Sequence, residues 1–169
     1  MTNKAVNDTT NASPDPHIEE LDDLRPPYKE AAIAGLLVFI LYAITLARTT
    51  AFWDTSEYIA TGHIMGIPHP PGNPLFVVLA RAWSVLLSPL QLSVAIRINL
   101  FSAVMSASAH ALWFLVVHHI LRYFSREHYF RLIGAAAAVL VSATAFTVWN
   151  QSNVNEKVYT CLLYTSDAA

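Results

Sequence analysis

The stretch from Ile98 to Leu121, INLFSAVMSASAHALWFLVVHHIL, decides the class of fold, because it holds 24 residues without Asp, Glu, Lys or Arg. A helix needs about 20 mainly apolar residues to cross the hydrocarbon core of a bilayer. Two more uncharged runs lie on either side of it, 17 residues at 31–47 and 18 residues at 132–149. The three runs predict an all-α membrane protein, a polytopic bundle with transmembrane helices at about 31–47, 98–121 and 132–149.

The composition agrees with this class. Apolar residues make up 54% of the 169 residues and charged residues 13%, against about 25% charged residues in soluble domains. Membrane lipid is therefore an expected partner over much of the surface. The net charge of -2 and the lack of a basic block exclude nucleic acid as a partner. The one cysteine, Cys161, cannot form a disulfide within the chain.

The basic residues predict the orientation of the chain in the membrane. Residues 1–30 are polar, contain no cleavable signal peptide, and are expected to form a disordered cytoplasmic tail that carries Arg25 and Lys29. The loop from Arg122 to Arg131 holds three arginines. Loops rich in Lys and Arg stay on the cytoplasmic side. Residues 48–97 are then an extracytoplasmic outer loop of a multi-pass protein.

Within this outer loop, residues 75–90 have the pattern of an amphipathic helix. Apolar side chains recur at helical spacing at Leu75, Leu79, Ala82, Trp83, Leu86 and Leu90. Arg81, Ser84 and Ser88 fall on the opposite face. The pattern predicts a helix lying in the membrane interface. The alternative is a fourth, short span that buries Arg81, at a cost of about 2.5–3.5 kcal/mol.

The start of the outer loop carries two carboxylates three residues apart, Asp54 and Glu57, directly after the first apolar run. One interpretation is a reactive site at the membrane surface. The other is a capping box for a short loop helix from about Thr55 to Met65, with Asp54 as N-cap and Glu57 as its N3 partner. The two interpretations are compatible, because a helix N-terminus also orients a carboxylate.

A proline-rich segment follows, in which Pro68, Pro70 and Pro71 hold His69 on stiff backbone. This histidine is either a functional residue or a surface residue of a rigid turn. After the third run, Glu156 is expected on the same side as Asp54, either near it or as a solvated loop acid. No spacing of His, Cys and carboxylate indicates a metal site.

Several motifs together resemble one family. Trp53-Asp54-x-x-Glu57 followed by His69-Pro70-Pro71-Gly72-x-Pro74-Leu75 is similar to the first luminal loop of a multi-spanning family, formerly a domain of unknown function. That family includes a vertebrate protein O-mannosyltransferase that acts on plexin-type (IPT) domains. Arg97–Ser102 and Glu156–Tyr159 match in the same order, so the resemblance covers about residues 31–160. Two positions depart from it: Ser56 replaces the usual glycine, and Lys157 interrupts the last motif.

The resemblance implies the N-terminal part of a GT-C-like fold. Such an enzyme moves a sugar, mannose-like here, from a polyprenyl-phosphate donor to a protein hydroxyl on the outer face, in this chain expected at a bacterial inner membrane. The implied partners are a lipid-linked sugar and a protein acceptor, and no cofactor is identified. The implied catalytic residues are Asp54 and Glu57, and the implied substrate-binding residues are His69, Arg97, Asn99 and Glu156. The alternative is a non-enzymatic transporter or assembly subunit with a structural outer loop.

The last nine residues, 161–169, lose the family pattern and are expected to be a non-native tail. The chain is therefore expected to be an N-terminal fragment that is inactive on its own, because three spans cannot enclose a site.

Overall fold

The computed structural model describes residues 25–50, 54–69 and 73–154. Every regular element in these ranges is helical, which confirms the predicted all-α class. Along the chain they are α2 (Tyr28–Ile44), α3 (Thr55–Ile64), α4 (Pro74–Leu86), the short 3-10 helix η1 (Ser88–Leu90), α5 (Val94–Leu121), α6 (His128–Thr144) and α7 (Phe146–Asn153). Glu156, the expected tail at 161–169 and most of the expected disordered segment lie outside the described residues. Helix α2 begins at Tyr28, inside that segment.

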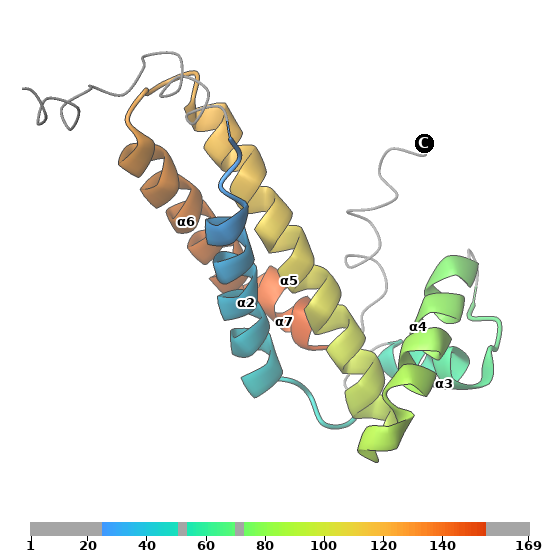
Figure 1. The fold of residues 1–169 in the computed structure, drawn as a ribbon. Helices are drawn as coiled ribbons and strands as arrows, with labels where there is room; N and C mark the ends of the chain where they lie inside the picture. The colour runs from blue at the N-terminus through green and yellow to red at the C-terminus, as the bar shows by residue number, and fades with distance from the viewer. Residues whose placement is uncertain (1–24, 51–53, 70–72, 155–169) are drawn as a thin grey trace, which may run out of the picture.

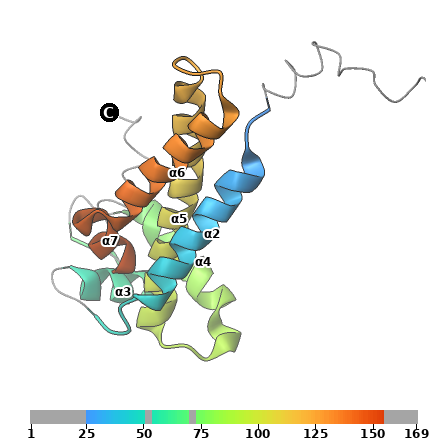
Figure 2. The same cartoon turned by 90° about the vertical axis from the view of Figure 1, so that its left-hand side faces the viewer.

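Helix α5 is the axis of the molecule. Its 28 residues correspond to about 42 Å, more than the roughly 30 Å of a bilayer core. Helices α2 and α6 pack along it, while α3 and α4 form a separate layer at its N-terminal end (Figures 1 and 2).

Small residues let the helices of this bundle approach closely. Ala103 and Ala107 of α5 are buried against α2 and α6, and a Cβ placed on Gly35 of α2 would lie 2.8 Å from the Cβ of Ala111. Interfaces of this kind are typical of helices packed in membranes. The outward faces are apolar: Leu36 and Leu37 of α2 are more than half exposed. The bundle therefore places small residues at its closest helix contacts and exposes large apolar residues on its outer faces.

Among the described helices, α5 alone is long and apolar enough to cross a membrane by itself. A second span exists only if α6 and α7 count as one. The three predicted spans are therefore not confirmed. Helix α2 has 17 residues, a length of about 26 Å.

The prediction of one continuous helix at 132–149 is wrong, because α6 ends at Thr144 and α7 leaves it at an angle of 66°. The chain is extended at Ala145, with ψ of 126°. In an unbroken helix, the Ala143 carbonyl would accept from the N–H of residue 147. Here it accepts from the Tyr42 hydroxyl at 3.0 Å. A helix break in a membrane is tolerated where a neighbouring helix satisfies the freed backbone groups in this way.

Helix α7 returns the chain to the end of α2. The Ala47 N–H donates to the Asn153 carbonyl at 3.2 Å, and the Trp149 indole donates to the Thr45 hydroxyl at 3.1 Å. The Asn99 amide of α5 donates to the Ala47 carbonyl at 2.9 Å. The end of α2, the beginning of α5 and the end of α7 thus meet at the end of the bundle that carries α3 and α4.

The helix predicted at 75–90 is present as α4 and η1, and its position in the membrane interface stays a prediction. Leu75 and Leu86 of the expected apolar stripe are exposed, and Ser84 of the expected polar face is buried. The buried face packs on α3 and α5 through a second core formed by Tyr58, Ile59, Phe76, Val77, Ala80, Ile98 and Phe101. Arg81 donates to the His63 carbonyl, so α3 and α4 hold one another.

Candidate functional site

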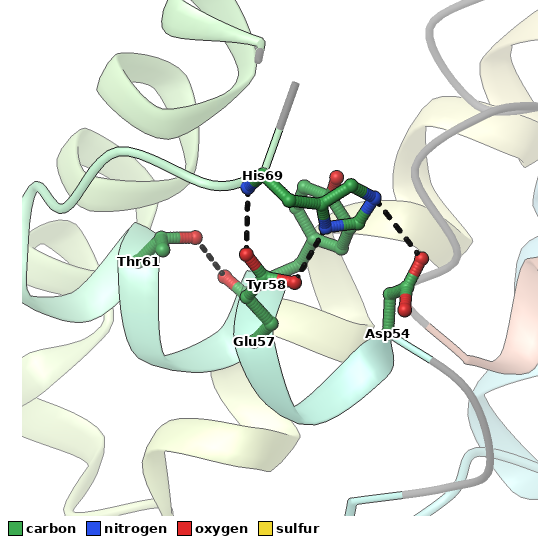
Figure 3. A network of polar contacts seen from close by, with 5 residues as sticks. All are labelled: Asp54, Glu57, Tyr58, Thr61 and His69. Atoms are coloured by element: carbon green, nitrogen blue, oxygen red, sulfur yellow. Dashed lines mark hydrogen bonds and ion pairs between the residues drawn. The ribbon is translucent and has the colours of Figure 1, made fainter. Parts of the chain in front are cut away.

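The N-terminal half of α3 and the segment that follows this helix bring three polar side chains together (Figure 3). Asp54 occupies the N-cap of α3 and Glu57 its first turn. The helix ends at Ile64, its C-cap Met65 has a left-handed φ of 56°, and the Gly66 N–H donates back to the Thr61 carbonyl at 3.0 Å. This reversal of the chain carries His69 back alongside the helix.

His69 lies between the two carboxylates. Its backbone N–H donates to Glu57 Oε1 at 2.7 Å, and its ring Nδ1 lies 2.6 Å from Glu57 Oε2. Its other ring nitrogen, Nε2, lies 3.5 Å from Asp54 Oδ2. We call Asp54, Glu57 and His69 the acid–histidine triad. Short contacts to an ionised carboxylate are among the stronger hydrogen bonds in proteins.

The triad faces outward from a rigid base. The side chains of Asp54 and His69 are 55% and 43% exposed. Beneath them the ring of Tyr58 is fully buried and meets the rings of His69 and Phe76 edge-on, with centroids 6.1 and 5.8 Å apart. The polar groups of the triad are therefore accessible to a large substrate, while the second core beneath them holds their backbone in place.

The capping-box prediction is wrong for Asp54, whose side chain makes no cap hydrogen bond. The predicted loop helix itself is confirmed, as Thr55–Ile64. The carboxylate of Glu57 faces His69, because the chain reversal at Met65 places both the backbone N–H and the ring of His69 within its reach.

The triad also has the composition of a metal site. Asp54, Glu57 and His69 each offer one ligand atom, and these atoms lie within 4.8 Å of one another. Carboxylate and imidazole are suitable ligands for several divalent ions. The spacing in the sequence did not reveal this set, because His69 is twelve residues from Glu57 and reaches it only through the reversal.

The other predicted site residues make different contacts. Arg97 donates from Nη1 to the Ser84 carbonyl at 2.7 Å, and its own carbonyl accepts from the Trp83 indole at 3.0 Å. Asn99 is fully buried and donates to the Ala47 carbonyl. The Arg97 side chain thus joins α5 to α4, and the Asn99 side chain joins α5 to the segment that follows α2. The predicted role of Glu156 lies outside the part of the chain that the structure describes.

Sequence reasoning missed Tyr58, which supports His69 from below. A signal for it was present, because Asp54, Glu57 and Tyr58 stand at i, i+3 and i+4, which places them on one side of a helix.

Comparison with known proteins gives consistent matches. Residues 54–166 match the model of a family described as the protein O-mannosyl-transferase TMEM260 N-terminal domain. Protein O-mannosyl-transferase TMEM260 of Mus musculus is 32% identical over 126 residues, which are 72% of this chain and 16% of the mouse protein. The tmem260 protein of Dictyostelium discoideum is 33% identical over 95 residues, 53% of this chain and 12% of that protein. No solved structure matched. The matches thus span less than a fifth of the length of either relative.

Proposed function

The chain belongs to the family of the protein O-mannosyl-transferase TMEM260 N-terminal domain, and from this premise we propose that it forms the N-terminal part of a membrane glycosyltransferase. The enzyme transfers a mannose-like sugar from a polyprenyl-phosphate donor to a protein hydroxyl on the extracytoplasmic face. The observation that carries the proposal is the acid–histidine triad, exposed at the end of an apolar helix bundle.

The proposed topology has three passes, formed by α2, by α5 and by the bent pair of α6 and α7. Two features support it. The ends of α2 and α7 meet beside the outer loop, as expected if the chain crosses once more after α5. The basic turn after α5 lies at the other end of the bundle (Figure 1), where the positive-inside rule requires the cytoplasm.

Asp54 is the proposed general base. Transfer to a hydroxyl needs a base whose oxygen lies within about 2.6–3.2 Å of the hydroxyl oxygen that it deprotonates. Both carboxylate oxygens of Glu57 are engaged by His69. Asp54 is the more exposed acid, and its contact with His69 is 3.5 Å long. Asp54 can therefore accept a proton from an acceptor hydroxyl, while Glu57 and His69 act as positioning residues for it.

The exposed stripe of α4 suits a lipid-linked donor. Leu75, Leu79 and Leu86 are exposed beside the triad-bearing helix α3. An apolar helix face beside exposed polar groups is expected at the boundary of acyl chains and headgroups. A polyprenyl chain lying against this stripe would bring its phosphate to the depth of the outer loop.

One observation favours the alternative of a transporter. Tyr42 and His110 are buried inside the bundle, and Ser106 and Ser152 share a 2.7 Å hydrogen bond beside the break between α6 and α7. Discontinuous helices with polar groups in the membrane form the binding sites of many transporters. The alternative places function at these residues and gives the triad only a structural role.

Asp54→Asn separates the two functions. The variant and the wild type, expressed from the whole reading frame in membranes, are assayed for transfer from a mannosyl polyprenyl phosphate to a protein acceptor. We expect a loss of about 10²–10⁴-fold. Glu127→Gln, at an exposed acid at the beginning of α6, is the matched control and should keep wild-type activity. Unchanged transfer by Asp54→Asn would remove Asp54 from the mechanism. No transfer by the wild type, with solute flux lost in His110→Ala, would support the transporter.

A further inference from the structure

A basic pocket of about 360 Å³ lies between the segment that leads into α2 and the C-terminal end of α5. Its walls carry Arg25, His118, His119 and Arg122. We propose that this pocket binds the phosphate headgroup of an anionic phospholipid. The proposal uses the membrane insertion of the proposed function but not its transferase chemistry.

The charge of the pocket comes from two parts of the chain that are far apart in sequence. Arg25 lies just before α2, and Arg122 lies directly after α5. Guanidinium groups bind phosphate through a planar fork of N–H donors. Two arginines on opposite walls can therefore hold one phosphate between them. Among the described residues that line this pocket, none is acidic.

The remaining walls are apolar and continue into the outer surface of α5. Leu115, Val116 and Ile120 line the pocket, and the last two are both 46% exposed. An acyl chain can therefore leave the pocket along the face of α5 that we place in lipid. A free phosphate ion would gain nothing from these apolar side chains, whereas the acyl chain of a lipid would pack against them.

The pocket also lies at the depth in the membrane where lipid headgroups are expected. Tyr123 and Phe124 follow α5 directly and are both 79% exposed. Aromatic residues concentrate where a membrane meets water, and basic pockets between transmembrane helices on the cytoplasmic side bind anionic headgroups. The aromatic pair thus marks the level of the headgroups, and the arginines of the pocket lie at that level.

The pocket is separate from the acid–histidine triad. Helix α5 is about 42 Å long, and the layer that holds the triad packs at its N-terminal end. The pocket lies at its C-terminal end. The lipid in this pocket is therefore not the sugar donor, and losing it leaves the chemistry of the triad intact.

Native mass spectrometry tests the proposal. The protein is reconstituted with equal amounts of phosphatidylglycerol and phosphatidylcholine, taken up in detergent, and the retained lipid is counted. We expect one phosphatidylglycerol per chain. Arg25→Gln and Arg122→Gln should each lower its retention at least about tenfold, the effect of losing one charge-assisted hydrogen bond to the phosphate. Arg126→Gln removes the same charge from an exposed position in the same turn, outside the pocket, and should change retention less than twofold.

Equal loss in all three variants would overturn the proposal, because it would indicate attraction to the surface as a whole. Equal retention of phosphatidylcholine would overturn it as well. Displacement of the lipid by inorganic phosphate alone would assign the site to a free anion. The two pocket variants lie in different segments, so the test survives if one of them fails to fold. Their transfer activity, measured separately, should match that of the wild type, so a failure here is distinguishable from a failure of the proposed function.

Discussion

His69 and Glu57 are joined at two points, because one carboxylate receives both the backbone N–H and the ring Nδ1 of the same histidine, at 2.7 and 2.6 Å. This double contact fixes the position of the residue and the rotation of its ring. It leaves Nε2 facing Asp54 at 3.5 Å. The arrangement is that of a base oriented through a histidine by a second acid, which is why we place the function of the outer loop here.

Glu57→Gln should change the tautomer of His69. Glutamine can still accept the backbone N–H, but its amide N–H₂ would face Nδ1 and favour a proton on Nε2. We expect transfer to fall at least about tenfold, because the Nε2–H then donates to Asp54 and competes with the acceptor hydroxyl for that carboxylate. The ¹⁵N shifts of the His69 ring report the tautomer directly. An unchanged tautomer in Glu57→Gln would contradict the positioning role, even if activity fell.

Arg97→Ala should destabilise the joint between α4 and α5. The variant leaves the Ser84 carbonyl without its guanidinium donor, and a hydrogen bond to a charged group contributes about 1.5–3 kcal/mol. Thermal unfolding in detergent measures the loss. Arg48→Ala, at an exposed arginine on the outer side, is the control and should unfold like the wild type. If Arg97→Ala instead raises the KM for the lipid-linked sugar without lowering Tm, the substrate-binding role implied by the family resemblance is supported.

Gly35→Ala should be more harmful than Gly134→Ala. A Cβ at Gly35 would meet the Ala111 Cβ at 2.8 Å and the Ala107 carbonyl at 3.2 Å, neither of which can rotate away. A Cβ at Gly134 would meet the flexible end of Leu121. Both changes gain about 1 kcal/mol of helix propensity, but overpacking costs about 1–3 kcal/mol. We expect Gly35→Ala to lower Tm and Gly134→Ala to leave it equal or higher. The reverse order would contradict the close packing of α2 on α5.

Cysteine labelling tests the proposed topology. In a Cys161→Ser background, Ser56→Cys lies on an exposed position of α3 and Ser125→Cys in the turn after α5. An impermeant maleimide added to intact cells should label residue 56 and reach residue 125 only after the membrane is opened. Labelling of residue 125 alone in intact cells would invert the orientation. Labelling of both would show that an even number of spans separates them.

The outer loop shows which structural features local sequence patterns can predict. The loop helix and the shared side of Asp54 and Glu57 follow from their spacing, because residues three apart are neighbours on a helix. The role of Glu57 does not follow, because the capping box and the contact with His69 compete for the same carboxylate. Only the left-handed turn at Met65 decides between them, and no glycine marks that position.

Helix α4 shows that hydropathy does not predict which face of a helix is buried. The hydropathy pattern predicts the helix and its leucine stripe, but it does not show whether that stripe packs on protein or on lipid, because large leucines are equally suited to both. The structure buries Phe76 and Val77 together with the small residues Ala80 and Ser84, and it exposes Leu75 and Leu86. In a membrane, close packing selects small side chains for helix contacts, so hydrophobicity alone does not identify the inner face.

The sequence by itself therefore determines the helical class, the apolar character of the bundle and the pair of acids at the beginning of the outer loop. These features depend on hydropathy and on the helical repeat, which act over a few residues. Only the tertiary structure decides that His69 completes the triad, that Arg97 joins two helices and that the third apolar run is broken. The break shows the reason: the Ala143 carbonyl loses its own helix partner and accepts from the hydroxyl of Tyr42, which lies 101 residues earlier in the chain.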